Sequence, residues 1–196
     1  MQDSTRIYLS KPSATPSDVD AVVAAIHSHW LAPAGPELTA FEVDMAFYTG
    51  AAHAVGLSSG TAGLHLGLKY LGVGPGDAVV IPTVTFGATA FSATYLDAQP
   101  VFIDVDQYFN MDVDLMREAL TELRKSGTRL GAVIPVDLYG TPCDYELLIS
   151  VCDDFEVPVL EDAAEGLGSK FGSQSLGALG RAGVFSFNGN KIITTS

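Results

Sequence analysis

Short apolar runs rich in Val and Ile alternate along the chain with longer segments in which apolar residues recur at helical spacing. The short runs predict strands at HAVGLS (53–58), DAVVIP (77–82), QPVFID (99–104), LGAVIPVD (130–137), VPVLED (157–162) and AGVFSF (182–187). The longer segments predict helices at about 60–71, 86–96, 112–125 and 142–155. This alternation is typical of crossover units, so the sequence predicts an α/β fold with three layers and a mainly parallel sheet.

Two further helices are predicted before the first strand, at about 16–29 and 36–49. Thr15 and Ser17 lie near the start of the first, and Asp18 and Asp20 occupy its first turn, where carboxylates favour the exposed amides. The second ends at Gly50. No repeat or linker divides the sequence, so we expect one layered unit preceded by a helical segment over about residues 1–50.

Composition and charge narrow the class of protein. Hydrophobic residues make up 47% of the chain and charged residues 17%, as in packed globular proteins. The net charge of −13 opposes binding to nucleic acids and anionic membranes. The chain shows neither a signal peptide nor an apolar run of roughly 18 residues, so we expect a cytoplasmic protein. Cys143 and Cys152 are expected to be reduced.

Small and polar residues follow the first predicted strand. Ser59, Gly60 and Thr61 form a turn that leads directly into a predicted helix. A helix start of this kind offers free amides, hydroxyls and the positive end of the helix dipole, which suit a phosphate group. A capped helix without any ligand is the alternative interpretation.

Further candidate residues follow the other strands at the same sheet edge. Glu161 and Asp162 end a predicted buried strand, where a carboxylate needs a cation, a metal or a protonated ring nitrogen, unless it lies in a hydrated loop. Phe86 could cover a flat ligand ring or belong to the core. Ser186 lies in the last predicted strand, and the turn after it brings Lys191 back over the strand end. A partly apolar environment would make this lysine nucleophilic, whereas a surface turn would not.

Together, a phosphate cradle, a stacking aromatic, an acid and a lysine are the groups that pyridoxal phosphate requires. Metal-binding patterns are weaker. Counting from Asp104, the sixth position of a possible calcium loop is Phe109 instead of Gly. His27 and His29 have no companion ligands. We expect no metal site.

Ordered blocks of sequence carry a family resemblance. They are WLAPAGPELTAFE, HAVGLSSGTAGLHLGLKYLGVGPGD, VIPTVTFGATA, PVFIDVD, VDLYGTPCD, VLEDAAEGLGS and FSFNGNKIITTS. They resemble the DegT/StrS family of pyridoxal-phosphate-dependent nucleotide-sugar aminotransferases, from IYLSKP to the last residue. This resemblance implies the large domain of the aspartate aminotransferase fold, fold type I.

The resemblance also implies roles for individual residues. Lys191 looks like the lysine that binds the cofactor covalently and moves protons, and Asp162 like the partner of the pyridine nitrogen. Phe86 looks like the ring-stacking residue. The implied phosphate contacts are Gly60, Thr61 and Ser186.

The activity implied by the resemblance is transamination with glutamate as the amino donor and a keto-sugar nucleotide as the acceptor. Glu165 and Asn188 are the implied substrate residues. Glu165 stands where many relatives carry Gln or His, and Asp137 where many carry His. This combination looks most like the enzymes that aminate C4 of a UDP-linked 4-keto-6-deoxy-N-acetylhexosamine, for surface-polysaccharide or glycan synthesis.

The family continues beyond the lysine with a glycine-rich turn, a further strand and a small C-terminal domain, and its dimer completes each site. Residues 1–196 are therefore expected to form an incomplete pyridoxal-phosphate-binding large domain that lacks the small domain, in a homodimer or larger assembly. The alternative is a truncated, non-catalytic remnant that self-associates through an unpaired sheet edge. A related sugar dehydratase would carry a histidine in place of Lys191, so the lysine opposes that interpretation.

Overall fold

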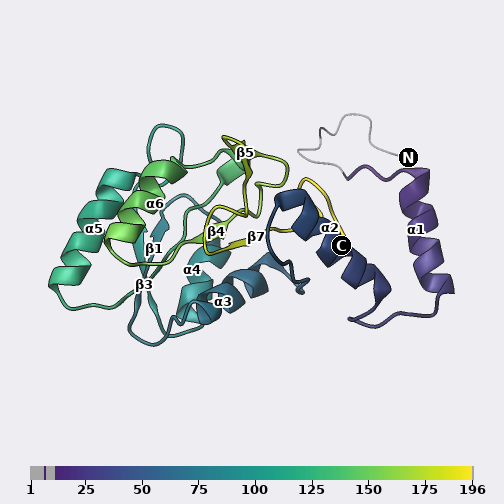
Figure 1. The fold of residues 1–196 in the computed structure, drawn as a ribbon, viewed down its shortest axis with the longest axis horizontal. Helices are drawn as coiled ribbons and strands as arrows, with labels where there is room; N and C mark the ends of the chain where they lie inside the picture. The colour runs from purple at the N-terminus through teal and green to yellow at the C-terminus, as the bar shows by residue number, and fades with distance from the viewer. Residues whose placement is uncertain (1–6, 8–11, 196) are drawn as a thin grey trace.

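The computed structural model describes residue 7 and residues 12–195, so residues 8–11 of the IYLSKP block lie outside the described residues. Its centre is a parallel sheet (Figure 1). In this sheet β1 (Ala78–Pro82) lies between β2 (Gln99–Ile103) and β3 (Leu130–Val133). A second parallel pair consists of β4 (Leu160–Asp162) and β7 (Ala182–Val184). The predicted parallel α/β fold is confirmed.

Parallel bridges join the two parts of the sheet between β3 and β4. Val133 pairs with Val159, and Val136 pairs with Asp162. The strands therefore follow the order β2-β1-β3-β4-β7. The strand predicted at 130–137 ends early, at Val133, because Pro135 has no amide to donate to a neighbouring strand. Its carbonyl still accepts the Asp162 amide at 3.0 Å.

Side chains alternate across the sheet and build a separate core on each face. Val79 and Ile81 pack with α3 (Gly60–Tyr70) and α4 (Gly87–Thr94), which lie together on one face. Val80 packs into the other core, with α5 (Val113–Lys125) and α6 (Tyr145–Asp154). This alternation follows from the period of two along a strand. The two buried cysteines, both free, lie in the second core.

The N-terminal helices lie beyond one end of the sheet (Figure 1). They are α1 (Pro16–His27) and α2 (Pro36–Thr49). The start of α1 is stabilised by the Thr15 amide, which donates to Asp18 at 2.7 Å, yet α1 buries none of its residues. The Phe41 ring of α2 meets the Phe187 ring edge-on at 5.1 Å. Among the described helices, none is long and apolar enough to cross a membrane.

The strand predicted at HAVGLS is wrong. Residues 53–58 form no strand, and Val55 is 70% exposed. The Gly56 amide donates to the Glu42 carboxylate at 2.8 Å instead of to a neighbouring strand. An apolar run becomes a strand only when another strand pairs with it, and no described segment does so here. Three short elements were not predicted: the 3-10 turn η1 (Leu138–Gly140), β5 (Lys170–Phe171) and β6 (Gln174–Ser175).

The helix α3 packs closely on the sheet through its glycines. A Cβ atom added at Gly63 would lie 2.7 Å from Cγ1 of Val184 in β7. We expect Gly63→Val to lower the free energy of unfolding by about 1–3 kcal/mol, since the β-branched Val184 cannot move aside. Urea unfolding measures the loss. Gly74→Val is the control, because an added Cβ there meets nothing within 4 Å; equal losses in the two variants would contradict the packing argument.

Candidate active site

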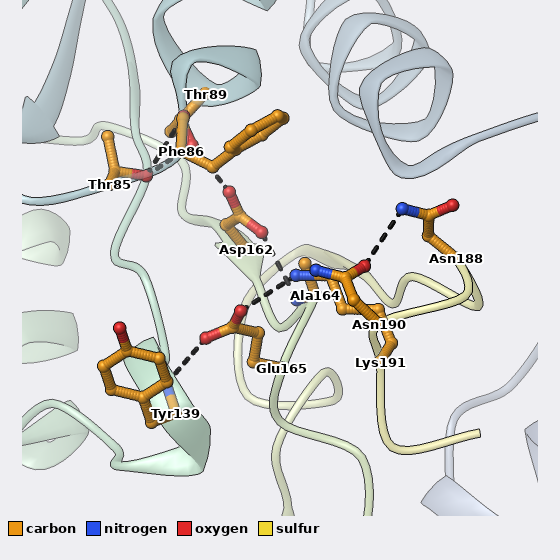
Figure 2. Close-up of polar contacts among 10 residues, drawn as sticks. All are labelled: Thr85, Phe86, Thr89, Tyr139, Asp162, Ala164, Glu165, Asn188, Asn190 and Lys191. Carbon is orange, nitrogen blue, oxygen red and sulfur yellow. Dashed lines mark hydrogen bonds and ion pairs between the residues drawn. The ribbon is translucent and has the colours of Figure 1, made fainter. Parts of the chain in front are cut away.

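Four strand ends bring Tyr139 and several of the predicted site residues to one edge of the sheet. Asp162 ends β4, and Ser186 and Lys191 follow β7. Phe86 follows β1 and precedes α4, and Tyr139 lies in the turn after β3. Because the strands are parallel, their carboxyl ends meet at the same edge. Figure 2 shows Phe86, Asp162, Glu165 and Lys191 gathered there.

Lys191 is bound by a carboxylate. Its Nζ donates to Oε1 of Glu165 at 2.9 Å, and only 15% of the lysine side chain is exposed. The other oxygen, Oε2, accepts the Tyr139 amide at 2.9 Å. Burial opposes ionisation of Glu165, but these hydrogen bonds and the lysine charge outweigh it and hold the pKa of Glu165 below its usual value. Lys191 is therefore part of an ion pair and is not a free lysine in a surface turn.

Asp162 lies at the base of the site and is almost completely buried. Its Oδ2 accepts the Thr89 hydroxyl at 2.7 Å, and that hydroxyl is 2.7 Å from the Thr85 hydroxyl. Burial raises the pKa of Asp162 above its usual value, and the Thr89 hydroxyl, the Ala164 amide and the charge of Lys191 offset only part of that rise. The surrounding donors thus support a carboxylate in a position where desolvation disfavours it.

Removing the Thr89 hydroxyl tests this support. We expect Thr89→Val to lower the free energy of unfolding by about 1–3 kcal/mol, since a buried carboxyl oxygen loses its donor. Thermal unfolding at neutral pH measures the change. Thr94→Val in the same helix is the control, because the Thr94 hydroxyl donates to the Phe91 carbonyl in an exposed position. A loss no greater than that of the control would contradict the role of Thr89.

The start of α3 has the form of an anion site. The Ser59 hydroxyl accepts the Ala62 amide at 3.1 Å, and the Ser59 carbonyl accepts the Gly63 amide. Among the described residues these contacts leave the Gly60 and Thr61 amides without a partner, as expected in the first turn of a helix. A Cβ atom added at Gly60 would lie 3.4 Å from Ser186, so the hydroxyl of Ser186 lies beside this helix start.

Phe86 and Asn188 lie on the open side of the site. Phe86 is 78% exposed, so it is not a core residue and its ring is available to a ligand. The Asn188 side chain donates to the Asn190 side chain at 3.0 Å, and Asn190 and Lys191 lie between it and Glu165 in Figure 2. The two predicted substrate residues therefore lie on different sides of Lys191.

A buried acid cluster behind the site was not predicted. Asp137 is fully buried, and its Oδ1 accepts the Tyr145 hydroxyl at 2.9 Å. Burial, and then the charge of Glu161, raise the pKa of Asp137 to about 9. Glu161 accepts the amides of Gly177, Leu179 and Gly180, which fixes the loop before β7. The sequence held one sign of this cluster. Neighbouring residues of a strand face opposite sides, so Glu161 had to point away from the side chain of Asp162.

The chain is similar in sequence to a known family and to proteins with names of their own. Residues 12–196 match the model of the DegT/DnrJ/EryC1/StrS aminotransferase family. EpsN of Bacillus subtilis, named as a candidate pyridoxal phosphate-dependent aminotransferase, is 44% identical over 97% of this chain and 50% of its own length. GDP-perosamine synthase of Caulobacter vibrioides is 38% identical over 100% of this chain and 51% of its own length.

Solved structures extend the similarity to the fold. The PLP-form of the candidate sugar aminotransferase Spr1654 from Streptococcus pneumoniae matches with a TM-score of 0.88 and 33% identity. The match covers 96% of this chain and 50% of that chain. The fold is thus that of pyridoxal-phosphate-dependent transferases of fold type I. The chain spans about half the length of the relatives that it matches.

Proposed function

The chain belongs to the DegT/DnrJ/EryC1/StrS aminotransferase family, and from this we propose that it carries the cofactor-binding part of an enzyme that aminates a keto-sugar nucleotide. The observation that carries the proposal is the convergence of Lys191 and Asp162 at one sheet edge, with the start of α3 beside Ser186. The lysine, the acid and the anion-binding helix start are far apart in the sequence. Binding of pyridoxal phosphate requires all three of them together.

The residues present suit this cofactor. The Gly60 and Thr61 amides and the Ser186 hydroxyl would hold its phosphate, because they lie together at the start of a helix. Asp162 would hold a protonated ring nitrogen, and the exposed ring of Phe86 would cover the flat face. When bound, pyridoxal phosphate supplies an aldehyde and an electron-accepting ring.

The chain's own contribution to the reaction is proton transfer and orientation. Lys191 Nζ, once it has lost a proton, can take one from a substrate carbon and return it to another atom. Asp162, when ionised, supplies a negative charge at the base of the site, and the Thr89 hydroxyl orients its Oδ2. Phe86 and the glycine turn before α3 restrict where a flat anionic ligand can lie.

For the substrate we propose a UDP-linked 4-keto-6-deoxy-N-acetylhexosamine, with glutamate as the amino donor. The support is the family resemblance at Glu165 and Asp137, together with the name of the GDP-perosamine synthase relative, which identifies that protein with a nucleotide-linked sugar. Asn188, exposed at the open side, is the proposed substrate contact.

The test of the proposed function has two stages. Purified protein mixed with pyridoxal phosphate is expected to develop a visible absorbance band, and borohydride is expected to fix the cofactor to Lys191. Glutamate and the UDP- or GDP-linked keto sugar are then added, and the amino sugar is measured by mass spectrometry. Attachment without product from either sugar would favour the non-catalytic remnant, and no attachment would contradict the cofactor assignment.

We also propose that the chain self-associates. The support is apolar exposure at the N-terminal helices: Val22 and Ile26, one turn apart on α1, are 61% and 53% exposed, and Phe47 on α2 is 89% exposed. Patches of this kind typically mark an interaction surface. Sedimentation velocity is expected to detect a species of twice the 20.6 kDa chain mass, and a single monomer boundary at all concentrations would contradict it.

A further inference from the structure

Glu165 joins two segments of the site that are far apart in the sequence. Its Oε1 accepts Nζ of Lys191 and its Oε2 accepts the backbone amide of Tyr139, each at 2.9 Å. Figure 2 shows the carboxylate between the turn that carries Tyr139 and the segment that carries Lys191. The glutamate side chain is 29% exposed and the lysine side chain 15%, so water competes weakly for this pair.

The chemistry of these contacts requires a carboxylate. Two donors approach two different oxygen atoms, and a glutamine offers only one acceptor oxygen. Its amide nitrogen would meet one of the two donors without forming a hydrogen bond. Tyr139 also has an unusual backbone conformation. It is left-handed (φ 53°, ψ 26°), which costs free energy in a residue other than glycine. Glu165 therefore stabilises this turn as well as the lysine.

We propose that Glu165 is a positioning residue for Lys191: its two oxygens fasten the lysine to the Tyr139 turn and hold its terminal nitrogen in a charge-assisted hydrogen bond. Lys191 must therefore give up this hydrogen bond and a proton before its nitrogen can react with an electrophile. The importance of Glu165 for binding pyridoxal phosphate rests on the proposed function, whereas the pairing of Glu165 with Lys191 does not. This role differs from the substrate contact that the family resemblance implied for Glu165.

The charged groups around Lys191 agree with this role. Among the described residues, two carboxyl groups act on it: Glu165, by direct contact, and Asp162, through its charge. The Asp162 carboxyl group already accepts hydrogen bonds from the Thr89 hydroxyl and the Ala164 amide. Of the two, Glu165 is the one that accepts a hydrogen bond from Lys191 Nζ, so replacing it removes the main favourable partner of that charge.

The test measures the reactivity of Lys191 in the full chain with acetic anhydride, which acylates an amine only in its neutral form. Limiting pulses are given between pH 6 and pH 10, and each lysine is quantified by peptide mass spectrometry. In Glu165→Gln we expect Lys191 to react about threefold to tenfold faster at pH 8, with its whole pH profile displaced to lower pH. Glu165→Ala, which also removes the charge, is expected to give the same change as Glu165→Gln. Glu165→Asp keeps the charge, so the reactivity of Lys191 is expected to stay close to that of the wild type.

The matched control is Glu122→Gln, which breaks the exposed pair between Lys125 and Glu122 at 2.7 Å. There the rate at Lys125 is expected to change by less than about twofold, because water screens the pair. Lys191 profiles that coincide in wild type and both neutral variants would overturn the proposal. If the displacement is found but pyridoxal phosphate does not attach, the proposed function fails and the pairing stands.

Discussion

Lys191→Ala is expected to abolish covalent attachment of pyridoxal phosphate completely. Lys191 is the lysine at the sheet edge beside Asp162, and its side chain is directed into the site by Glu165 at 2.9 Å. An alanine offers no amine to the aldehyde, so the visible band fixed by borohydride is expected to disappear. The measurement is the mass of the intact chain after reduction, with and without the cofactor.

The control for this prediction is Lys170→Ala. Lys170 is exposed in β5, and its removal is expected to leave attachment at the wild-type level. Equal attachment in the wild type and in Lys191→Ala would show that another amine reacts, and it would remove the main support for the proposed function.

The second large effect concerns Asp137. Its pKa is raised to about 9, mainly by burial and then by the charge of Glu161, while an unfolded aspartate titrates near 3.8. Between these values the folded chain binds a proton that the unfolded chain releases. The stability that this proton contributes is complete below about pH 4 and is lost as the pH rises toward 9.

Asp137→Asn removes this titration while nearly preserving the shape of the side chain. We expect the variant to be more stable than wild type at pH 8, by on the order of 2 kcal/mol, and about equal to it at pH 4. Urea unfolding at a series of pH values measures the difference. Asp44→Asn, at an exposed position of α2, is the control and is expected to change stability little at either pH. A difference from wild type that does not vary with pH would contradict a protonated Asp137.

The strands and helices were largely predictable because their signals are local. The runs DAVVIP and QPVFID became β1 and β2, with bounds close to those expected. The failure at HAVGLS has the same origin, since a local pattern reports apolar character and not the presence of a pairing strand. The early end of β3 was visible in principle, because Pro135 interrupts that run.

The candidate site was predictable in part. Parallel strands place their carboxyl ends together, so grouping Asp162, Phe86 and Lys191 followed from the sequence pattern. The partner of Lys191 did not, because Glu165 lies 26 residues away along the chain. The neutral form of Asp137 was equally hidden, since it depends on complete burial beside Glu161.

The sequence by itself therefore determined the layered α/β architecture and the edge of the sheet at which the reactive residues gather. Both follow from periodicity and strand direction, which are encoded over a few neighbouring positions. Only the tertiary structure decided which carboxylate holds Lys191, which acid is protonated and which apolar run lacks a strand partner. Those properties depend on distances and burial between residues remote in the chain, where electrostatic interactions are strong because water is excluded.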